Sequence, residues 1–482
     1  MTALATNKME QWSWPPRYDE GYAPAPDQTH WFPRRETMDP DERDEQILAR
    51  IQQVMAYAWD KAPFYRKKWD EAGIHPSSIR TLADFEKVPV VRKEEIRADQ
   101  LANQPFGSYL CVDPTDVKHI NGTSGTTGRP TAFGLNHSDW RSVANAHARV
   151  MWAMGIRPSD TVLIGSPLSL YFGSWGAYIG AERLGARVFP FGAGTAGQTL
   201  RTVRWIQQMG VTVFYGTPSY ALHLAETAQS NGVAPESLGL RKLFFSGEPG
   251  ASIPAIRNHI VDAFQAEVYD SGSMAEVSPW MHLGAARNEP GVFAWQDLVY
   301  TEVCDPTTQR RLEYGSEGTP VYTTLERTSQ PMIRLLSNDL TTWEAPSADR
   351  GRTYPFLPKG IYGRIDDMFT IRGENIYPSA IDDVVMSAPH YGGEHRIMIS
   401  RDDTMDELVV QVEHSDGVDA ASIDGWATQI SDRLRTVLGI GAIVVPVRQS
   451  TFERTEFKAK RVIDDRDMLQ QMRRHMEARA DS

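Results

Sequence analysis

Short apolar segments alternate with longer amphipathic ones from residue 139 to residue 270, and this alternation constrains the fold more than any other sequence feature. The short segments have the composition of strands and cover residues 161–165, 187–190, 211–215, 242–245 and 268–269. The segments of helical pattern cover residues 139–154, 175–184, 199–209, 219–230 and 254–264. Strands that alternate with helices pair in parallel through right-handed crossovers, and ligands bind at their carboxyl ends. We therefore predict an α/β fold with mostly parallel sheets.

The N-terminal region has a different pattern. Residues 1 to about 40 show no clear period and are interpreted as an irregular arm. Apolar positions in residues 44–72 recur at three and four, which is helical spacing, and Pro63 interrupts the run. We expect two helices there.

The C-terminal third is richer in β-structure. Residues 299–304 and 319–325 are typical of antiparallel strands, which predicts a β-subdomain. The segment after Asp367 reads β-α-β-β-α-β and is small enough to form a separate α+β domain. Because 482 residues exceed the size at which one core keeps growing, we expect two or three domains.

Charge and cysteine content exclude several classes of protein. The chain has 62 acidic and 50 basic residues, and a net charge of −12 argues against a nucleic-acid partner or an anionic membrane surface. Cys111 and Cys304 are the only cysteines, which leaves no disulfide framework and no cysteine-based zinc site. The first residues lack the apolar core of a secretory signal, and no stretch reaches the roughly 18 apolar residues of a membrane span. We expect a cytoplasmic protein.

Residues 121–131 form a loop of three glycines, five hydroxyl residues and one arginine between two strand-like runs. Glycines let the backbone approach a ligand closely, and successive N–H groups in such a loop form a concavity for anions. The pattern predicts a grip on a polyphosphate, although a solvent-exposed loop has the same composition. It is not a Walker A motif, because Thr127 stands where the second glycine is needed and Arg129 follows Gly128.

A second glycine-rich stretch, residues 192–197, satisfies GxGxxG between a strand and a helix. A dinucleotide site also needs an acidic residue about 20 positions further on, and residues 216–218 read Gly-Thr-Pro instead. We therefore interpret these glycines as a tight turn.

Two carboxylates stand where a nucleotide could use them. Glu276 follows a strand and a turn of small residues, and it could hold Mg²⁺ on phosphate oxygens or lie on the surface. Asp339 stands at a strand end, where it could accept both hydroxyls of a ribose or cap a turn. Residues 453–461 form a basic loop that a solvated tail would match equally well.

In this order and spacing, the motifs resemble the adenylate-forming superfamily of acyl-CoA synthetases over nearly the whole chain. The glycine loop is similar to that family's TSGTTGKP, with Arg129 in place of lysine. Five further segments resemble phenylacetate–CoA ligases, namely residues 62–66, 181–185, 216–220, 246–249 and 375–379.

The resemblance implies a two-step reaction with ATP, Mg²⁺ and coenzyme A. A small-molecule carboxylic acid attacks the α-phosphate to give acyl-AMP, and CoA then displaces AMP. The positions that match the family's phosphate-binding residues are Thr123, Ser124, Gly125, Thr126, Thr127, Gly128 and Arg129, with Glu276 on Mg²⁺. The positions that match nucleotide-binding residues are Gly247, Glu248, Pro249, Tyr269, Asp270, Asp339, Arg364 and Arg372.

The resemblance also implies a moving C-terminal domain. Asp366 matches the hinge, which divides the chain into a large adenylation domain at 1–365 and a small mobile domain at 366–482. Lys458 matches the lysine that contacts the carboxylate and α-phosphate during adenylation, and Lys460 is its rival. Loss of Lys458 should slow acyl-AMP formation by about 10²–10³ and spare thioester formation from supplied acyl-AMP. A homodimer is implied by the resemblance alone.

For the acyl pocket, strand-end residues next to the nucleotide site are the candidates, and they are Tyr171, Phe172, Gly173, Phe245, Gly272 and Ser273. Aromatic walls without a cation favour an aryl or arylacetic acid, although each aromatic could equally be core. In residues 272–276 the family's aromatic and hydroxyl residues are missing. Two alternatives therefore stay open: an adenylating enzyme with another acceptor (a carrier-protein thiol, an amine or a cofactor hydroxyl) and a non-catalytic nucleotide sensor.

Overall fold

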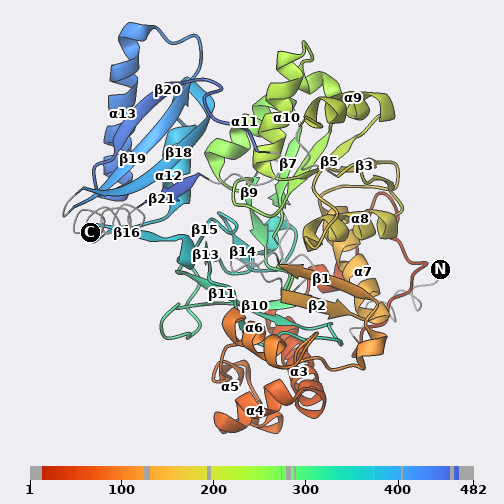
Figure 1. Cartoon of the computed structure of the whole chain (residues 1–482). Helices are drawn as coiled ribbons and strands as arrows, with labels where there is room; N and C mark the ends of the chain where they lie inside the picture. The colour runs from red at the N-terminus through yellow and green to blue at the C-terminus, as the bar shows by residue number, and fades with distance from the viewer. Residues whose placement is uncertain are drawn as a thin grey trace, which may run out of the picture.

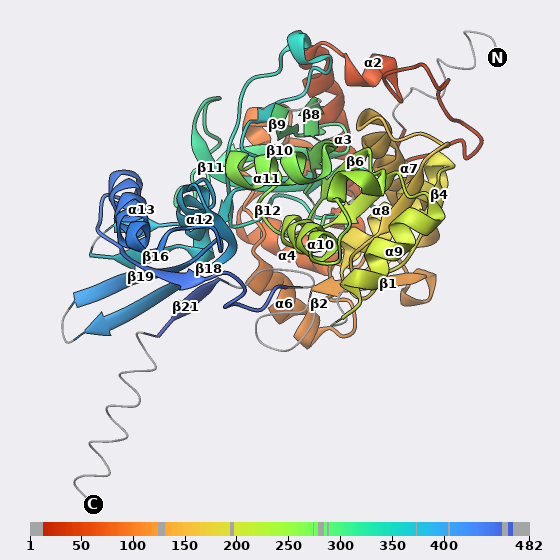
Figure 2. The same cartoon turned by 90° about the horizontal axis from the view of Figure 1, so that it is seen from above.

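A computed structural model describes residues 13–123, 131–192, 197–272, 274–277, 284–286, 289–372, 374–402, 405–455 and 461–465. Figures 1 and 2 both show a large domain with a smaller C-terminal domain, drawn in blue, on one side of it. This is the predicted α/β fold with a separate α+β domain. Among the described residues no helix is long and apolar enough to cross a membrane.

The N-terminal region is helical over the predicted residues 44–72. Its helices are α2 (Pro33–Glu36), α3 (Pro40–Lys61), α4 (Pro63–Glu71), α5 (Leu82–Phe85) and α6 (Lys93–Ala102). Of these, α2 lies within the stretch interpreted as an irregular arm, and α6 was not predicted. The Asp39 side chain caps α3 by accepting hydrogen bonds from two backbone N–H groups of its first turn. Pro63 has no backbone N–H group to donate to a helical hydrogen bond, so α3 ends at Lys61 and a second helix, α4, begins at Pro63.

The centre of the large domain is a five-stranded parallel sheet in the order β4-β3-β5-β6-β7. Its strands are β3 (Thr161–Ile164), β4 (Arg187–Phe189), β5 (Val213–Gly216), β6 (Lys242–Phe245) and β7 (Glu267–Asp270). The connecting helices are α7 (His137–Ala153), α8 (Phe172–Leu184), α9 (Thr199–Met209), α10 (Pro218–Ser230) and α11 (Pro254–Phe264). The chain runs outward from β3 to β4 and then returns to the other side of β3, which creates a topological switch point between β3 and β5.

Both faces of this sheet are covered, which is why most positions in its strands are apolar, with charged residues such as Arg187, Lys242 and Glu267 at strand ends. Side chains alternate between the faces. Phe214 and Phe245 belong to the core formed with α9, α10 and α11, whereas Tyr215 and Phe244 belong to the core formed with α7 and α8.

Antiparallel strands form the β-subdomain. They are β8 (Gly284–Ala286), β9 (Glu289–Phe293), β10 (Val299–Cys304), β11 (Glu317–Thr324), β12 (Leu335–Leu336), β13 (Asp339–Thr342), β14 (Phe356–Leu357) and β15 (Gly363–Arg364). β10 and β11 pair from Val299↔Thr324 to Cys304↔Thr319, which confirms the predicted antiparallel pair. The parallel part of the large domain is therefore a single sheet.

The C-terminal domain has its own apolar core. Its elements are β16 (Phe369–Ile371), β17 (Glu374–Ile376), α12 (Pro378–Met386), β18 (Tyr391–Asp402), β19 (Met405–His414), α13 (Ile423–Leu438), β20 (Ile443–Arg448) and β21 (Val462–Asp464). The main sheet has the order β20-β19-β18-β21. β17 and β21 were absent from the prediction, because both are three-residue strands with charged or amide residues.

A buried ionic network ties the N-terminal arm to the rest of the large domain. Arg149 of α7 is 1% exposed; its Nε donates to Glu36 at 3.0 Å and its Nη1 to Asp297 at 2.7 Å. The second Glu36 oxygen accepts from Arg352 at 2.9 Å. Arg35 pairs with Asp297 at 3.1 Å and with Glu326 at 3.5 Å. Three guanidinium groups and three carboxylates thus compensate one another, as buried charges require.

Candidate active site

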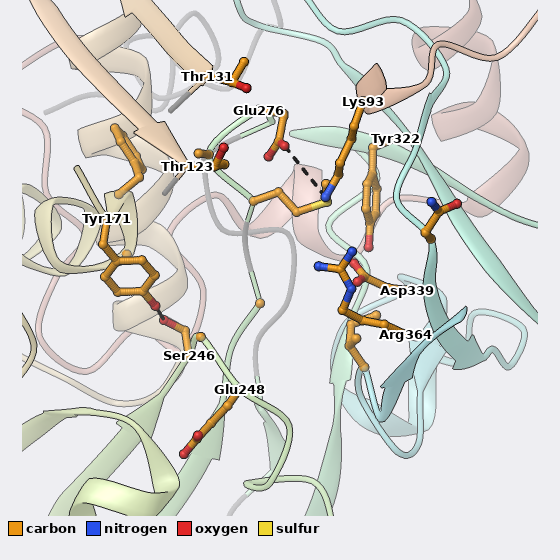
Figure 3. Close-up of a pocket in the computed structure, with 18 of the residues that line it drawn as sticks. Lys93, Thr123, Thr131, Tyr171, Ser246, Glu248, Glu276, Tyr322, Asp339 and Arg364 are labelled. Atoms are coloured by element: carbon orange, nitrogen blue, oxygen red, sulfur yellow. Dashed lines mark hydrogen bonds and ion pairs between the residues drawn. The ribbon is translucent and has the colours of Figure 1, made fainter. Parts of the chain in front are cut away.

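A cavity of about 720 Å³ lies at the carboxyl ends of the parallel strands. Its walls come from α6, from a hairpin of β1 (His119–Thr123) and β2 (Thr131–Leu135), from the β3–α8 connection, from the ends of β6 and β7, and from β11, β13 and β15. In Figure 3, Lys93, Tyr322, Asp339 and Arg364 line one side, and Tyr171, Ser246 and Glu248 line the other. The cavity is where an α/β sheet is expected to bind its ligand.

The ends of the predicted phosphate loop reach this cavity. Thr123 and Thr131 pair directly in the β1–β2 hairpin and both line the wall. At Gly122 a Cβ atom would lie 2.7 Å from the Thr131 carbonyl oxygen, so the close approach of the strands there requires glycine. The predicted residues Ser124, Gly125, Thr126, Thr127, Gly128 and Arg129 lie outside the described residues.

Glu276, the predicted metal ligand, lines the cavity and is 4% exposed. Lys93 Nζ lies 3.7 Å from its Oε1 atom. Among the residues that the structure describes, no group of three or more His, Cys, Asp or Glu side chains could hold a metal by itself. One buried carboxylate nevertheless fits Mg²⁺, because this ion takes one or two protein carboxylates together with substrate phosphates.

The predicted ribose side is built on neighbouring antiparallel strands. Asp339 of β13 pairs in register with Arg364 of β15, and both line the cavity with Tyr322 of β11. Burial raises the pKa of Tyr322 well above its usual value, and the nearby Asp339 carboxylate adds to the shift. The phenol therefore stays protonated at neutral pH, and this corner offers a carboxylate acceptor beside hydroxyl and guanidinium groups.

The predicted adenine side consists of the turn after β6 and the end of β7. Gly247, Glu248, Pro249 and Asp270 all line the cavity, and Glu248 accepts a hydrogen bond from the Ser219 N–H at 2.8 Å.

Asp270 is a buried carboxyl group of the cavity wall. It is 8% exposed, and its Oδ2 atom accepts from the Ser252 hydroxyl at 2.6 Å. Burial raises the pKa of Asp270 to about 6, although hydrogen bonds from Ser252 and Ser271 oppose this shift.

The predicted acyl side carries a chain of hydroxyl groups. Tyr171 Oη lies 2.9 Å from Ser246 Oγ, and Tyr215 Oη lies 2.6 Å from the same atom. A Cβ atom on Gly173 would lie 2.5 Å from both phenol oxygens, so only glycine fits beneath them. A hydroxyl group both donates and accepts, so this hydroxyl cluster (Tyr171, Tyr215, Ser246) can bind a polar substituent of the acid in either role.

Not every predicted residue lines the cavity. Phe172, Gly173 and Gly272 do, but Phe245 belongs to the core with α9–α11, on the opposite face of the sheet from Tyr215.

Two residues predicted to bind the nucleotide also lie elsewhere. The Tyr269 hydroxyl donates to Glu267 at 2.6 Å, away from the cavity wall. Arg372 is exposed and donates to the Asp406 carbonyl at 3.0 Å. Ser273 and Lys458 lie outside the described residues. Asp366 lies in the one-turn segment Ile365–Asp367 between β15 and β16.

Several lining residues carried no predicted role, among them Lys93, Arg97, Ser246 and Tyr322. A role for Ser246 could have been predicted from the sequence, because it is the first residue of segment 246–249, which resembles phenylacetate–CoA ligases. Tyr322 is one of several apolar or hydroxyl residues in β11, and nothing local separates it from its neighbours.

An adenylate-forming enzyme is the class indicated by three features. These are the cavity at the strand ends, the β1–β2 hairpin beside it and the separate C-terminal domain. The sequence model of the family described as AMP-binding enzyme matches residues 48–321, and that of the AMP-binding enzyme C-terminal domain matches residues 373–466. The chain belongs to this family, which confirms the resemblance drawn from the motifs.

Similar proteins narrow the class further. The phenylacetate-coenzyme A ligase of Aromatoleum evansii is 32% identical over 87% of this chain and 93% of its own. A solved 2-hydroxyisobutyryl-CoA ligase with 2-HIB-AMP, in the postadenylation state, is 55% identical and has a TM-score of 0.92, with 98% and 99% of the two chains covered. The same ligase in the thioesterification state, with 2-HIB-AMP and CoA, has a TM-score of 0.73 at 55% identity, with 97% and 99% covered. This chain is an AMP-forming acyl-CoA ligase.

Proposed function

We propose that this ligase activates a small 2-hydroxy carboxylic acid as its acyl-AMP and transfers the acyl group to CoA. The observation that carries the proposal is the hydroxyl cluster, in which Tyr171 and Ser246 line the acyl side of the cavity and the buried Tyr215 lies behind Ser246. A site built to hydrogen-bond a substrate hydroxyl rejects the analogue without it, because buried polar groups are then left unpaired. The 55% identity to a 2-hydroxyisobutyryl-CoA ligase supports the same acid class.

The reaction balances in two steps. A carboxylate oxygen of the acid attacks the α-phosphorus of ATP, and the bond to pyrophosphate breaks. The CoA thiolate then attacks the acyl carbon, and AMP leaves with the bonding electron pair. Asp339 and Arg364 orient the ribose, while Lys93 and the hydroxyl of Thr123 face the phosphate region. Mg²⁺ held by Glu276 and phosphate oxygens would neutralise charge on the triphosphate.

The division of labour between the domains is also part of the proposal. We place the boundary at residue 366, with Asp366 as the hinge, and assign Lys458 to the adenylation step. The two solved states of the 2-hydroxyisobutyryl-CoA ligase support two domain arrangements in this chain as well. A homodimer remains a prediction that light scattering on the purified protein would test.

An aryl or arylacetic acid is the second candidate substrate. The identity to phenylacetate-coenzyme A ligase favours it, and so do the aromatic rings of Tyr171 and Phe172 on the cavity wall. Two observations weaken this candidate. Phe245 faces the core rather than the cavity, and the Tyr171 hydroxyl lies within hydrogen-bonding distance of Ser246.

Carboxylate-dependent pyrophosphate exchange distinguishes the two substrates. We would compare 2-hydroxyisobutyrate with pivalate, in which a methyl group replaces the hydroxyl, and with phenylacetate and benzoate. We expect kcat/KM for the hydroxy acid to exceed that for pivalate by about tenfold or more. Tyr171→Phe should shrink this ratio and leave the KM for ATP unchanged. A preference for phenylacetate over every hydroxy acid would overturn the proposed substrate class. AMP release with CoA, compared with other acceptors, tests the second half-reaction.

A further inference from the structure

Arg454 connects the C-terminal domain to the large domain. Its Nε atom donates to Glu226 Oε2 at 2.7 Å, and Glu226 lies on α10 of the large domain. Its Nη2 atom donates to Glu413 Oε2 at 2.8 Å, and Glu413 lies on β19 of its own domain. The Glu413 side chain is fully buried, whereas the Glu226 side chain is 32% exposed. One guanidinium group therefore bridges an internal and an interdomain carboxylate.

The backbone of the C-terminal domain leaves room for this bridge at Gly393. Gly393 lies in β18, where the pairing register with β19 shifts between Tyr391 and His395, and its φ is +109°. A Cβ atom there would lie 2.3 Å from Glu226 Oε1 and 2.8 Å from Arg454 Nη2. The Glu226 carboxylate of the large domain thus lies against the Gly393 backbone of the C-terminal domain. A side chain at position 393 would occupy the place of this carboxylate.

Other contacts between described residues across this boundary include aromatic and apolar ones. His259 of α11 stacks on Tyr391 with ring centroids 6.2 Å apart, and Met386 of α12 belongs to the core formed by α9, α10 and α11. Figure 1 shows α12 next to α11. Contacts of this kind tolerate sliding, whereas a charge-assisted hydrogen bond demands one geometry.

The domain arrangement matches one of two states of a protein with 55% identity. The TM-score is 0.92 for the postadenylation state and 0.73 for the thioesterification state, although both chains are covered at 97% or more. Because the identity is 55% in both comparisons and the coverage differs by one percentage point, we attribute the difference in TM-score to the placement of domains. The Glu226–Arg454 pair therefore belongs to the arrangement of the adenylation side of the cycle.

We propose that Glu226 is a positioning residue that holds the C-terminal domain in the adenylating arrangement through Arg454. The inference rests on the proposed two-state division of the reaction. When the domain turns, Arg454 keeps its bond to Glu413 and no buried charge is left unpaired, while Glu226 becomes solvated on α10. The contact can thus be made and released without disturbing the core of either domain.

Glu226→Ala tests the proposal, because it removes the interdomain bond and leaves the Arg454–Glu413 bond in place. Pyrophosphate exchange reports acyl-AMP formation, and CoA added to supplied acyl-AMP reports thioester formation. We expect the rate of pyrophosphate exchange to fall about tenfold, because one charge-assisted hydrogen bond is lost. The rate of thioester formation should stay the same or rise. Glu226→Gln should give an intermediate effect. Glu236→Ala, an exposed glutamate of the same domain, is the matched control and should change neither rate.

A structural role alone would lower both half-reactions together with the melting temperature, and that outcome would overturn the proposal. Unchanged exchange in Glu226→Ala would overturn it as well. Salt gives a second readout, since raising ionic strength screens a partly exposed pair and should slow exchange more in the wild type than in Glu226→Ala. If the wild-type protein shows no carboxylate-dependent pyrophosphate exchange, the proposed function is wrong. This result differs from those that contradict the role of Glu226, so the two proposals are tested separately.

Discussion

The ammonium group of Lys93 lies 3.7 Å from the carboxylate of Glu276, so a helix of the N-terminal region meets a turn that follows the last parallel strand. Both residues line the cavity beside the ends of the glycine-rich loop. The pair places a cation and a carboxylate at the proposed phosphate site, where the cation would contact phosphate oxygens and the carboxylate would hold a metal.

Replacing Lys93 with Met should raise the KM for ATP about tenfold, because one charge-assisted contact to a phosphate oxygen is lost. The KM for the acid should stay within about twofold by the same argument. Lys87→Met is the matched control, since that lysine pairs with Asp84 on the surface and is 71% exposed. Steady-state pyrophosphate exchange at varied ATP provides the measurement; an unchanged KM for ATP would exclude Lys93 from the phosphate site.

Gly173→Ala should abolish acid binding while ATP binding survives. The new methyl group would lie 2.5 Å from the phenol oxygens of Tyr171 and Tyr215, so the hydroxyl cluster must separate. We expect kcat/KM for the acid to fall by about 10² or more, because buried hydroxyls lose their partners.

A second glycine-to-alanine variant provides the control for this effect. Gly425 lies within α13 and has no atom within 4 Å of its Cβ position, so Gly425→Ala should be neutral or slightly stabilising. ATP binding by calorimetry and acid-dependent exchange separate the effects. Loss of ATP affinity in Gly173→Ala would mean that the variant is misfolded.

Asp270 should make stability depend on pH in an unusual direction. Its pKa is raised from 3.8 to about 6 by burial, so between these values the folded protein binds a proton more tightly than the unfolded chain does. The stabilisation by protonation is complete below pH 3.8 and is lost as the pH rises through 6. From pH 7 to pH 5 the free energy of unfolding should gain about 1.4 kcal/mol from this group alone.

The comparison with Asp270→Asn isolates this contribution. The difference in unfolding free energy between wild type and variant should shift by that amount over the pH interval, as measured by urea denaturation. Asp84→Asn is the control, because hydrogen bonds from Lys87 and Thr81 lower the pKa of Asp84 to about 2, outside the interval. A parallel pH dependence of wild type and Asp270→Asn would contradict the assignment.

Removing one guanidinium from the buried network should destabilise the large domain strongly. Arg149→Met leaves Asp297 and Glu36 each without one partner, which we expect to cost about 3–5 kcal/mol. Arg34→Met, which removes a surface arginine paired with Glu42 at 3.5 Å, should cost no more than about 1 kcal/mol. Denaturation midpoints measure both; equal effects would show that the network is unimportant for stability.

The parts of the fold that local pattern determines were predictable. The strands of the parallel sheet are mostly apolar because both its faces are covered, and each connecting helix shows helical spacing. The positions of these elements along residues 139–270 and their parallel pairing were therefore predictable, whereas the order of the strands in the sheet was not predicted. The short strands β17 and β21 have no such pattern and exist only because β16 and β18 pair with them.

Contacts between distant segments were not predictable. Lys93 lies near Glu276 only because the N-terminal helices pack against the β-subdomain. The local spacing of apolar residues does not predict this contact. Phe245 shows the limit within one strand. Its place at a strand end suggested the cavity, but the alternation of side chains turned it to the α9–α11 face. The hydroxyl of the next residue, Ser246, faces the cavity instead.

The position of Glu36 gives the irregular arm before α3 an importance that its lack of pattern conceals. Its two oxygens bind Arg149 and Arg352, which lie far apart in the large domain's sequence. A chain shortened past this residue would take one carboxylate from each of two buried arginines, so truncation from the N-terminus should destabilise the large domain before it reaches the first long helix, α3.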